Sequence, residues 1–325
     1  MYTMISNVAY KASLETLISK DAANDEFISF YKTFDAGVKI ALAGMPTKYF
    51  ARDSYNALQE LVKMLCRDDL PVSDHLAERH ECLKKSLGMS KEDIAKDDLL
   101  WAWAAVTNLV PSQFWNLYFI LSDSDAMEAV KEEVDTIMGK RKTEDGPFDG
   151  TFTLEELDSM VRIESAIKEA IRLSFGGLVM RVIMQDMTID LKRVGSKIST
   201  KYFLEKDSSI MFHVPVLHKD PTIFESPDEY RWNRFLPDPD TGRAPTFQAS
   251  SGEVIVDPFR GFGGGSHYCP GRKLAMYIGK SLVAHMIYTY DMNVIGSTGY
   301  DMELDSVGTL RPQDSVELEL NTRKK

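Results

Sequence analysis

One long uncharged stretch limits most strongly how this chain can fold. Residues 99–121 include no charged side chain over 23 positions, a length that would cross a bilayer as a helix. Polar and helix-breaking residues cluster in the middle of the stretch, where contact with lipid costs most. A helix that is apolar on all sides is typical of a protein core. We therefore predict a long helix buried inside a folded protein and no transmembrane segment.

Helical patterns dominate the chain to about residue 185. The tetrapeptide Thr153-Leu154-Glu155-Glu156 forms a capping box, and apolar spacing continues from it to residue 173. Apolar residues also recur at spacings of three and four, with charged residues between them, in residues 11–17, 53–66, 73–87 and 124–138.

Strand-like and irregular patterns follow. Residues 187–212 form short runs broken at Asp207-Ser208-Ser209, which predicts a small sheet or a pair of hairpins. The seven prolines between residues 215 and 258 predict irregular surface chain. Residues 272–290 are again helical in pattern, and residues 316–320 alternate like a strand. We predict a mainly α fold with a small β component, organised as one domain over residues 1–325.

Charge and cysteine content exclude several classes of protein. The 325 residues include 38 basic and 49 acidic side chains, so the net charge of −11 argues against a nucleic-acid partner. The three cysteines show no C-x-x-C spacing, so the sequence suggests neither a zinc site nor a disulfide framework. The first 20 residues intersperse charged and apolar residues and offer neither a signal peptide nor an anchor.

A glycine-rich loop with one cysteine concentrates the candidate chemistry. Residues 259–272 read F-R-G-F-G-G-G-S-H-Y-C-P-G-R, so that Cys269 stands just before a predicted helix. The first backbone N–H groups of a helix are unpaired and its dipole is positive there, which stabilises a thiolate as an anion, a nucleophile or a metal ligand. The glycines allow a flat, bulky group to approach the backbone.

Three other interpretations compete for this loop. A dinucleotide loop requires glycine at the position of Ser266, and a phosphate-binding Gly-Lys-Ser/Thr is also missing. A nucleophilic Cys269 would require a base, and His267 is too near in sequence to face it easily. A buried structural cysteine in a glycine-rich turn is the simplest alternative.

The loop resembles a known signature. Phe262-x-x-Gly265-x-x-x-Cys269-x-Gly271 is similar to the haem-binding sequence F-x-x-G-x-x-x-C-x-G of the cytochrome P450 family. The resemblance implies the cytochrome P450 fold and haem b, with Cys269 as the axial thiolate ligand of the iron. It also implies that Phe262 packs against the haem and that Gly265 and Gly271 permit its close approach.

Two further residues are implied as haem contacts. His267 in the loop and Arg181 would pair with the haem propionates. Arg181 is implied because Arg181-x-x-x-x-Asp186 follows the helix that carries Glu169 and Arg172, as in the family. The preceding residues 176–180 would line the substrate pocket.

A Glu-Arg-Arg cluster is the second family element. Glu169-Ala170-Ile171-Arg172 is similar to the family's E-x-x-R, and Arg234 is similar to its third member. Taken alone, a Glu–Arg pair at this spacing is usually solvated. Apolar neighbours indicate burial, where an arginine requires further partners. The resemblance therefore implies a structural cluster of Glu169, Arg172 and Arg234, and the segments around His218-Lys219-Asp220-Pro221 also resemble the family.

The uncharged stretch points to one branch of the family. Most members carry A-G-x-[DE]-T there, but residues 107–111 place neither the acid nor the alcohol at the matching positions. Asn108-x-x-Pro111-x-x-Phe114-Trp115 instead resembles the variant of sterol 7α- and 12α-hydroxylases and prostacyclin synthase. This implies Asn108 and Pro111 as catalytic positions. The alternative for Asn108 is a cap or helix contact beside a proline kink.

The resemblance implies an enzyme, a haem-dependent monooxygenase that hydroxylates a sterol or similar lipid. It would use O2 and electrons from an NADPH-cytochrome reductase. One alternative is an endoperoxide isomerase like prostacyclin synthase, and another is a non-catalytic, truncated remnant. Family members have an N-terminal anchor, early strands and a Trp/Arg helix that are expected to be missing, because Met1 aligns inside the family fold. The full-length family belongs to the endoplasmic reticulum membrane, whereas loss of the anchor would leave this chain in the cytoplasm.

Overall fold

The computed structural model describes residues 1–144, 149–192, 197–249, 251–296, 301–304, 308–313 and 316–323. The chain divides into two compact units, Met1–Pro111 and Ser112–Lys325. Helix α6, Lys91–Ser122, crosses the boundary between them and continues through Pro111. The two units are described separately below.

The first unit is helical. Asn24 and Ser73 begin two of its helices, because each side chain accepts a backbone N–H three residues later. Helices α2 and α4 pack so closely that a β-carbon on Gly37 would lie 2.3 Å from the β-carbon of Ser54. Besides the start of α6, the helices are α1 (Tyr2–Leu17), α2 (Asp25–Leu42), α3 (Thr47–Phe50), α4 (Arg52–Leu65) and α5 (Asp74–Leu87), with a short 3-10 helix at Asp21–Ala23.

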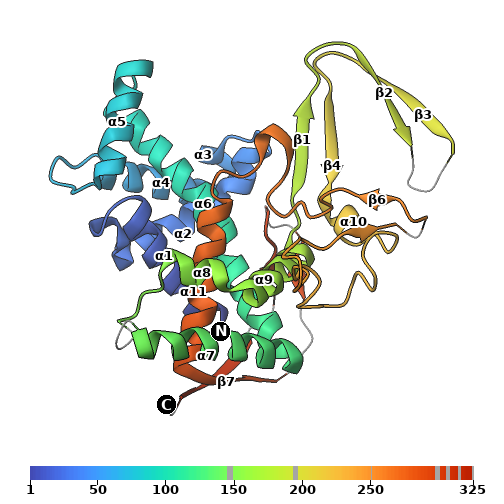
Figure 1. Cartoon of the computed structure of the whole chain (residues 1–325). Helices are drawn as coiled ribbons and strands as arrows, with labels where there is room; N and C mark the ends of the chain where they lie inside the picture. The colour runs from blue at the N-terminus through green and yellow to red at the C-terminus, as the bar shows by residue number, and fades with distance from the viewer. Residues whose placement is uncertain are drawn as a thin grey trace. The chain divides into compact units, whose positions relative to one another are not determined.

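The second unit combines helices with short antiparallel ladders (Figure 1). Its helices are the end of α6, α7 (Ser124–Glu144), α8 (Leu154–Ser159), α9 (Val161–Ser174), α10 (Val214–His218) and α11 (Arg272–Thr289), with a 3-10 helix at Gly265–His267. Among the residues that the structure describes, the strands pair as β1 (Leu178–Val182) with β4 (Ser209–His213), β2 (Met187–Lys192) with β3 (Ser199–Leu204), β5 (Phe247–Gln248) with β6 (Val254–Ile255), β7 (Tyr290–Ile295) with β10 (Glu317–Thr322), and β8 (Met302–Glu303) with β9 (Arg311–Pro312).

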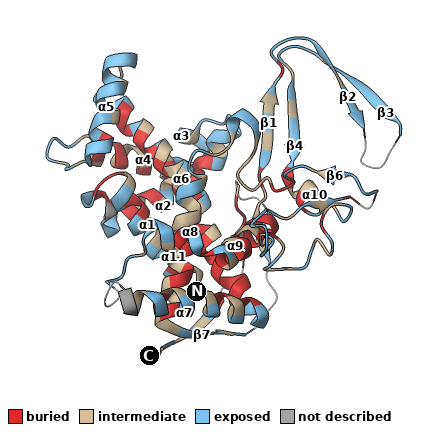
Figure 2. Ribbon diagram, in the orientation of Figure 1, coloured by how far each residue is buried: buried red, intermediate tan, exposed pale blue. Residues whose placement is uncertain are grey.

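Helix α9 is the centre of the second unit. Most of its residues are buried, whereas β2 and β3 are exposed along most of their length (Figure 2). Helix α9 packs against α7 and α11. The buried rings of Phe114 and Tyr118 on α6 stack on each other, and both meet the buried Trp115 ring edge-on. Trp115 Nε1–H donates to the Leu310 carbonyl at 2.6 Å. Helix α9 is therefore part of the core of this unit.

The predicted mainly α fold with a small β component is confirmed. The uncharged stretch is a helix within α6, and its residues 113–120 are buried. The capping box between Thr153 and Glu156 is formed as predicted. One hairpin, β2 with β3, forms within residues 187–212, whereas β4 pairs with β1, which precedes this range. The predicted closing strand is formed as β10. No helix in the described part of the chain is both long and apolar enough to cross a membrane.

Two boundary predictions are wrong. The helix expected to run from residue 154 to 173 is interrupted at Met160, where ψ is 71°. The helical pattern expected to about residue 185 ends at Ser174, because a β-carbon on Gly176 would lie 2.3 Å from Leu310 Cδ2, and the Gly176 N–H donates to the Gly308 carbonyl at 2.8 Å. Strand pairing with β4 then determines β1.

Close packing at Gly279 generates the first prediction. A β-carbon there would lie 3.0 Å from Ile167 Cδ1 and 3.2 Å from Asn116 Nδ2, and both neighbours are buried. Gly279→Ala should lower the free energy of unfolding by about 1–3 kcal/mol through overpacking. Gly139 on α7 is the control, since nothing lies within 4 Å of its position. Gly139→Ala should raise the free energy of unfolding by about 0.5–1 kcal/mol. Urea unfolding measures both, and equal effects would contradict the packing.

Candidate functional site

Cys269 lies in a closed loop at the start of α11. Its backbone N–H donates to the Phe262 carbonyl at 2.9 Å, so the loop returns on itself. Gly271 is the N-cap residue of α11, and Arg272 Nη1 donates to the Cys269 carbonyl at 3.1 Å. The Cys269 thiol is half-buried and forms no disulfide. Cys269 therefore stands two residues before the N-cap of α11.

Glycines give this loop its shape. Gly263 and Gly265 have φ angles of 77° and 66°, in the left-handed region where residues with a β-carbon are strained. Gly271 serves another purpose, because a β-carbon there would lie 3.8 Å from Cys269 Sγ. A larger side chain at 271 would occupy the space beside the sulfur. The loop therefore leaves the thiol open on that side.

Arg181 reaches the cysteine loop from β1. Its Nη2 lies 3.5 Å from the Gly264 carbonyl, and its Nη1 donates to the Met180 carbonyl at 2.8 Å. His267 belongs to the loop itself but is exposed, and its Nδ1 lies 3.0 Å from Ser266 Oγ. The structure thus brings Arg181 to the loop that carries Phe262, Gly265, His267, Cys269 and Gly271.

The predicted residues of α6 lie in the first unit. Asn108 is exposed, and its Nδ2 donates to the Ala104 carbonyl of the same helix at 3.3 Å. Pro111 provides no N–H for the Thr107 carbonyl one turn earlier. The Thr107 hydroxyl donates to Asp35 Oδ1 on α2 at 3.1 Å. An acid and an alcohol therefore meet beside this turn, although they come from different helices.

Glu169, Arg172 and Arg234 form a buried ionic cluster. Arg172 binds the Glu169 carboxylate through two bonds, from Nε at 2.8 Å and from Nη2 at 2.9 Å. Arg234 Nε donates to Glu169 Oε1 at 2.8 Å. The side chains of Glu169 and Arg172 are 0% exposed and that of Arg234 is 7% exposed. Removal of water makes each of these charges dependent on the others.

The remaining donors of this cluster bind backbone carbonyls. Arg172 Nη1 donates to the carbonyls of His218 at 2.6 Å and Pro227 at 2.7 Å. Arg234 Nη1 donates to the Glu225 carbonyl at 2.8 Å. These carbonyls lie in a segment that has little regular structure of its own, so the two arginines hold it in place.

His218 connects the cluster to the cysteine loop. Its Nδ1–H donates to the Arg172 carbonyl at 3.1 Å, and its Nε2 accepts the Arg260 N–H at 3.0 Å. The ring is fully buried and stacks on Phe259, with centroids 5.8 Å apart. Burial lowers the pKa of His218 to about 4. The neutral ring is what this geometry requires, because Nε2 must remain an acceptor.

From the sequence, His218 is only part of a segment that resembles the family, with no role assigned to it. A burial estimate from its neighbours could have suggested one. No local signal could have shown that its two ring nitrogens contact residues 46 and 42 positions away.

Comparison with known proteins identifies the class. The family model described as Cytochrome P450 matches residues 52–320. Because this match covers most of the chain, the chain belongs to the cytochrome P450 family. Members of this family hold a haem through a cysteine thiolate.

Its relatives include the branch predicted from the sequence. The chain is 33% identical over 299 residues to the 25-hydroxycholesterol 7-alpha-hydroxylase of Rattus norvegicus, covering 90% of this chain and 68% of that protein. It is 25% identical over 245 residues to prostacyclin synthase of Homo sapiens, covering 74% of this chain and 47% of that protein. The chain spans about two thirds of the length of the curated relatives it matches, or less.

A solved structure shares the fold. The retinoic acid bound cyanobacterial CYP120A1 matches 99% of this chain and 69% of its own, with a TM-score of 0.73 and 18% sequence identity. The predicted cytochrome P450 fold and the predicted branch are therefore confirmed.

The ionic cluster generates the second prediction. Glu169→Gln should lower the free energy of unfolding by about 3–5 kcal/mol, because two guanidinium groups would stay buried without their carboxylate. Glu225→Gln is the control, since the Glu225 side chain pairs with Arg231 at 3.1 Å but is 84% exposed. It should cost about 1 kcal/mol at most. Urea denaturation measures both changes. Similar losses of unfolding free energy in the two variants would show that the buried cluster contributes no more stability than an exposed ion pair.

The buried histidine generates the third prediction. The pKa of His218 is about 4 when folded and about 6.5 when unfolded, so the unfolded chain binds the extra proton between these values. The stability contribution is complete above pH 6.5 and is lost as pH falls to 4. The unfolding free energy of the wild type falls as the pH is lowered from 7 to 4.5. In His218→Asn this fall should be smaller by about 2–3 kcal/mol. His213→Asn, at an exposed position on β4, should retain the wild-type pH dependence. An unchanged slope in His218→Asn would contradict the assignment.

Proposed function

We propose that the chain is a haem-thiolate monooxygenase in which Cys269 is the axial ligand of the iron of haem b. The observation that carries this proposal is the half-buried thiol held at the N-terminus of α11 by the Phe262–Cys269 backbone bond. The two compact units would together form one haem-thiolate domain. Members of a single family match across both of them.

The donor set suits haem. In the part of the chain that the structure describes, no three His, Cys, Asp or Glu side chains gather as a metal site. A single thiol, that of Cys269, suits a metal whose other ligands come with the cofactor. The open space beside Sγ at Gly271 suits a flat ring as well.

Other side chains would position the cofactor. Arg181 uses two of its N–H groups on backbone carbonyls, and a guanidinium has five donors, so further donors remain for a propionate. His267 is exposed and would pair with the second propionate. Phe262 would pack against the ring, and Gly265 would keep the loop clear of it. When bound, haem supplies the oxygen chemistry.

The substrate would be a sterol or a similar lipid. Support comes from the relative named as a 25-hydroxycholesterol 7-alpha-hydroxylase, which shares 33% identity. Electrons would come from an NADPH-cytochrome reductase, and the enzyme would work at the endoplasmic reticulum membrane. Asn108 and Pro111 would act together, because the Thr107 carbonyl lacks a helical donor from Pro111 and the Asn108 amide can hold a hydroxyl or water nearby.

An endoperoxide isomerase is the second candidate. Its support is the 25% identity to prostacyclin synthase, which is lower and covers less of the chain. A hydroxylase consumes NADPH in step with product, whereas an isomerase does not require it. NADPH-independent turnover of an endoperoxide would replace the first proposal with this one.

Substitution of the cysteines generates the fourth prediction. The full chain loaded with haem, reduced and exposed to carbon monoxide, should show the red-shifted Soret band of a thiolate complex. Cys269→Ser should lose this band, because the ligand is then a hydroxyl. Cys66→Ser and Cys82→Ser are the matched controls and should keep it. A histidine-type spectrum in the wild type, or loss of the band in a control, would contradict the proposal. Failure to bind haem would favour the non-catalytic alternative.

A further inference from the structure

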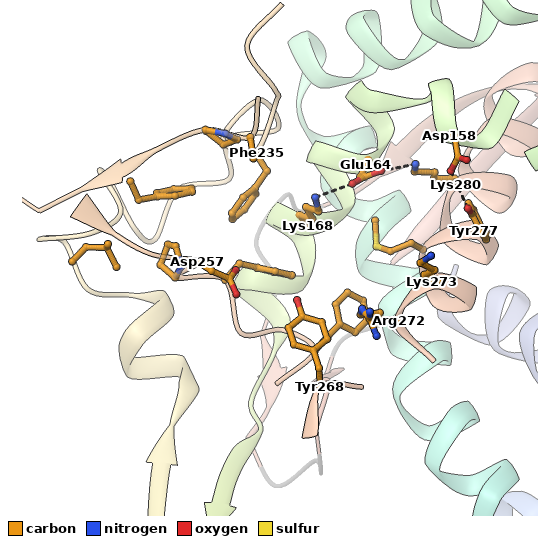
Figure 3. Close-up of a pocket in the computed structure, with 18 residues that line it drawn as sticks. Asp158, Glu164, Lys168, Phe235, Asp257, Tyr268, Arg272, Lys273, Tyr277 and Lys280 are labelled. Atoms are coloured by element: carbon orange, nitrogen blue, oxygen red, sulfur yellow. Dashed lines mark hydrogen bonds and ion pairs between the residues drawn. The ribbon is translucent and has the colours of Figure 1, made fainter. Parts of the chain in front are cut away.

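A cavity opens in the second unit beside the cysteine loop. It has a volume of about 580 Å³ and is formed by α8, α9, α11 and the segments before and within the loop. This volume lies within the range of small-molecule sites. Figure 3 shows charged side chains from the helices on one side of the cavity and Phe235 on the other.

Aromatic rings form the apolar part of the cavity. Phe235 contacts Phe247 and Phe259, with ring centroids 5.6 and 5.3 Å apart. Phe259 in turn contacts Phe262 at 6.1 Å. Phe235 and Phe259 are buried, so these rings are held by the core and form a firm surface. A flat apolar group could cover this surface by edge and face contacts.

The acidic side chains of the cavity already have partners. Glu164 accepts from Lys168 at 2.8 Å and from Lys280 at 2.6 Å, so one carboxylate serves two ammonium groups (Figure 3). Burial opposes ionisation of Glu164, but the two lysines together lower its pKa. Asp257 pairs with Arg260, and Asp158 accepts from the Tyr277 hydroxyl at 2.9 Å.

Two cations of the cavity have no carboxylate partner among the described residues. Arg272 donates to the Cys269 carbonyl and lies 4.8 Å from the centroid of the Tyr268 ring. Lys273 is exposed and makes no described ion pair or hydrogen bond. In a chain of net charge −11, this cavity has four basic and three acidic side chains. Local charge therefore favours an anion.

We propose that this cavity binds a monoanionic amphiphile, a flat apolar body that carries one carboxylate, sulfonate or sulfate group. The apolar body covers the Phe235–Phe259 surface, and the anion lies at Arg272 and Lys273. The bound molecule contacts Phe262, Tyr268 and Arg272, which hold or flank Cys269.

Two fluorescent arylamines test the proposal on the full chain. The probe 8-anilinonaphthalene-1-sulfonate carries the anion, and N-phenyl-1-naphthylamine has the same rings without it. The sulfonate should bind at one saturable site and more tightly than the neutral amine. Lys273→Gln should weaken sulfonate binding about fivefold to tenfold, the value of one charge-assisted contact, and leave the amine unchanged. Added salt should weaken the binding of the sulfonate and leave the binding of the neutral amine unchanged.

Two further variants make the test specific. Ala244 is exposed and lines the cavity, so Ala244→Trp should fill the cavity without disturbing the core. This variant should bind neither probe. Lys201 is exposed on β3 and does not line the cavity, so Lys201→Gln should change neither affinity. Equal affinity of the two probes in wild type and Lys273→Gln would overturn the proposal, as would full binding by Ala244→Trp or no saturable binding.

Discussion

The buried carboxylate of Glu169 is the interaction on which the second unit depends. A carboxylate without water must receive enough hydrogen bonds to offset its lost hydration, and here both oxygens accept from guanidinium groups. Each arginine then has donors left over, and these bind carbonyls of residues 218–229. That segment lies outside the strand ladders, so the ionic cluster satisfies backbone groups that a sheet would otherwise pair. Lysine could not replace Arg172, because a single ammonium lacks the planar set of donors.

Hydrogen bonds connect this segment to the Cys269 loop. Two hydrogen bonds with Arg172 position His218. The His218 carbonyl accepts from the Arg172 guanidinium, and the His218 Nδ1–H donates to the Arg172 carbonyl. Its Nε2 fixes the Arg260 N–H, two residues before Phe262, whose carbonyl holds the Cys269 N–H. A metal ligand performs well only when groups behind it fix its direction. The charged cluster and the candidate ligand are therefore parts of one continuous support, linked by a neutral imidazole.

Local signals in the sequence predicted the parts of the fold that local forces decide. The capping box at Thr153, the uncharged helix and the alternation of the last strand depend on neighbours within a few residues. The break after Ser174 does not, because the Gly308 carbonyl and the Leu310 side chain decide it from more than 130 positions away. The same is true of the site. Cys269 and its glycines form a contiguous motif, whereas the approach of Arg181 to Gly264 and the cavity beside the loop result from tertiary packing.

The turn of α6 before Pro111 shows how far such long-range effects reach. From the sequence, residues 107–111 place no acid and no alcohol where most of the family does. In the structure Asp35 on α2 accepts from Thr107 Oγ1 at 3.1 Å and from Trp103 Nε1 at 2.8 Å. Asp35 is buried, and a buried carboxylate requires donors of this kind. An acid and an alcohol can therefore meet beside this turn although they belong to different helices. A search for the pair along one segment would miss it, because the contact is a property of the packing of α2 on α6.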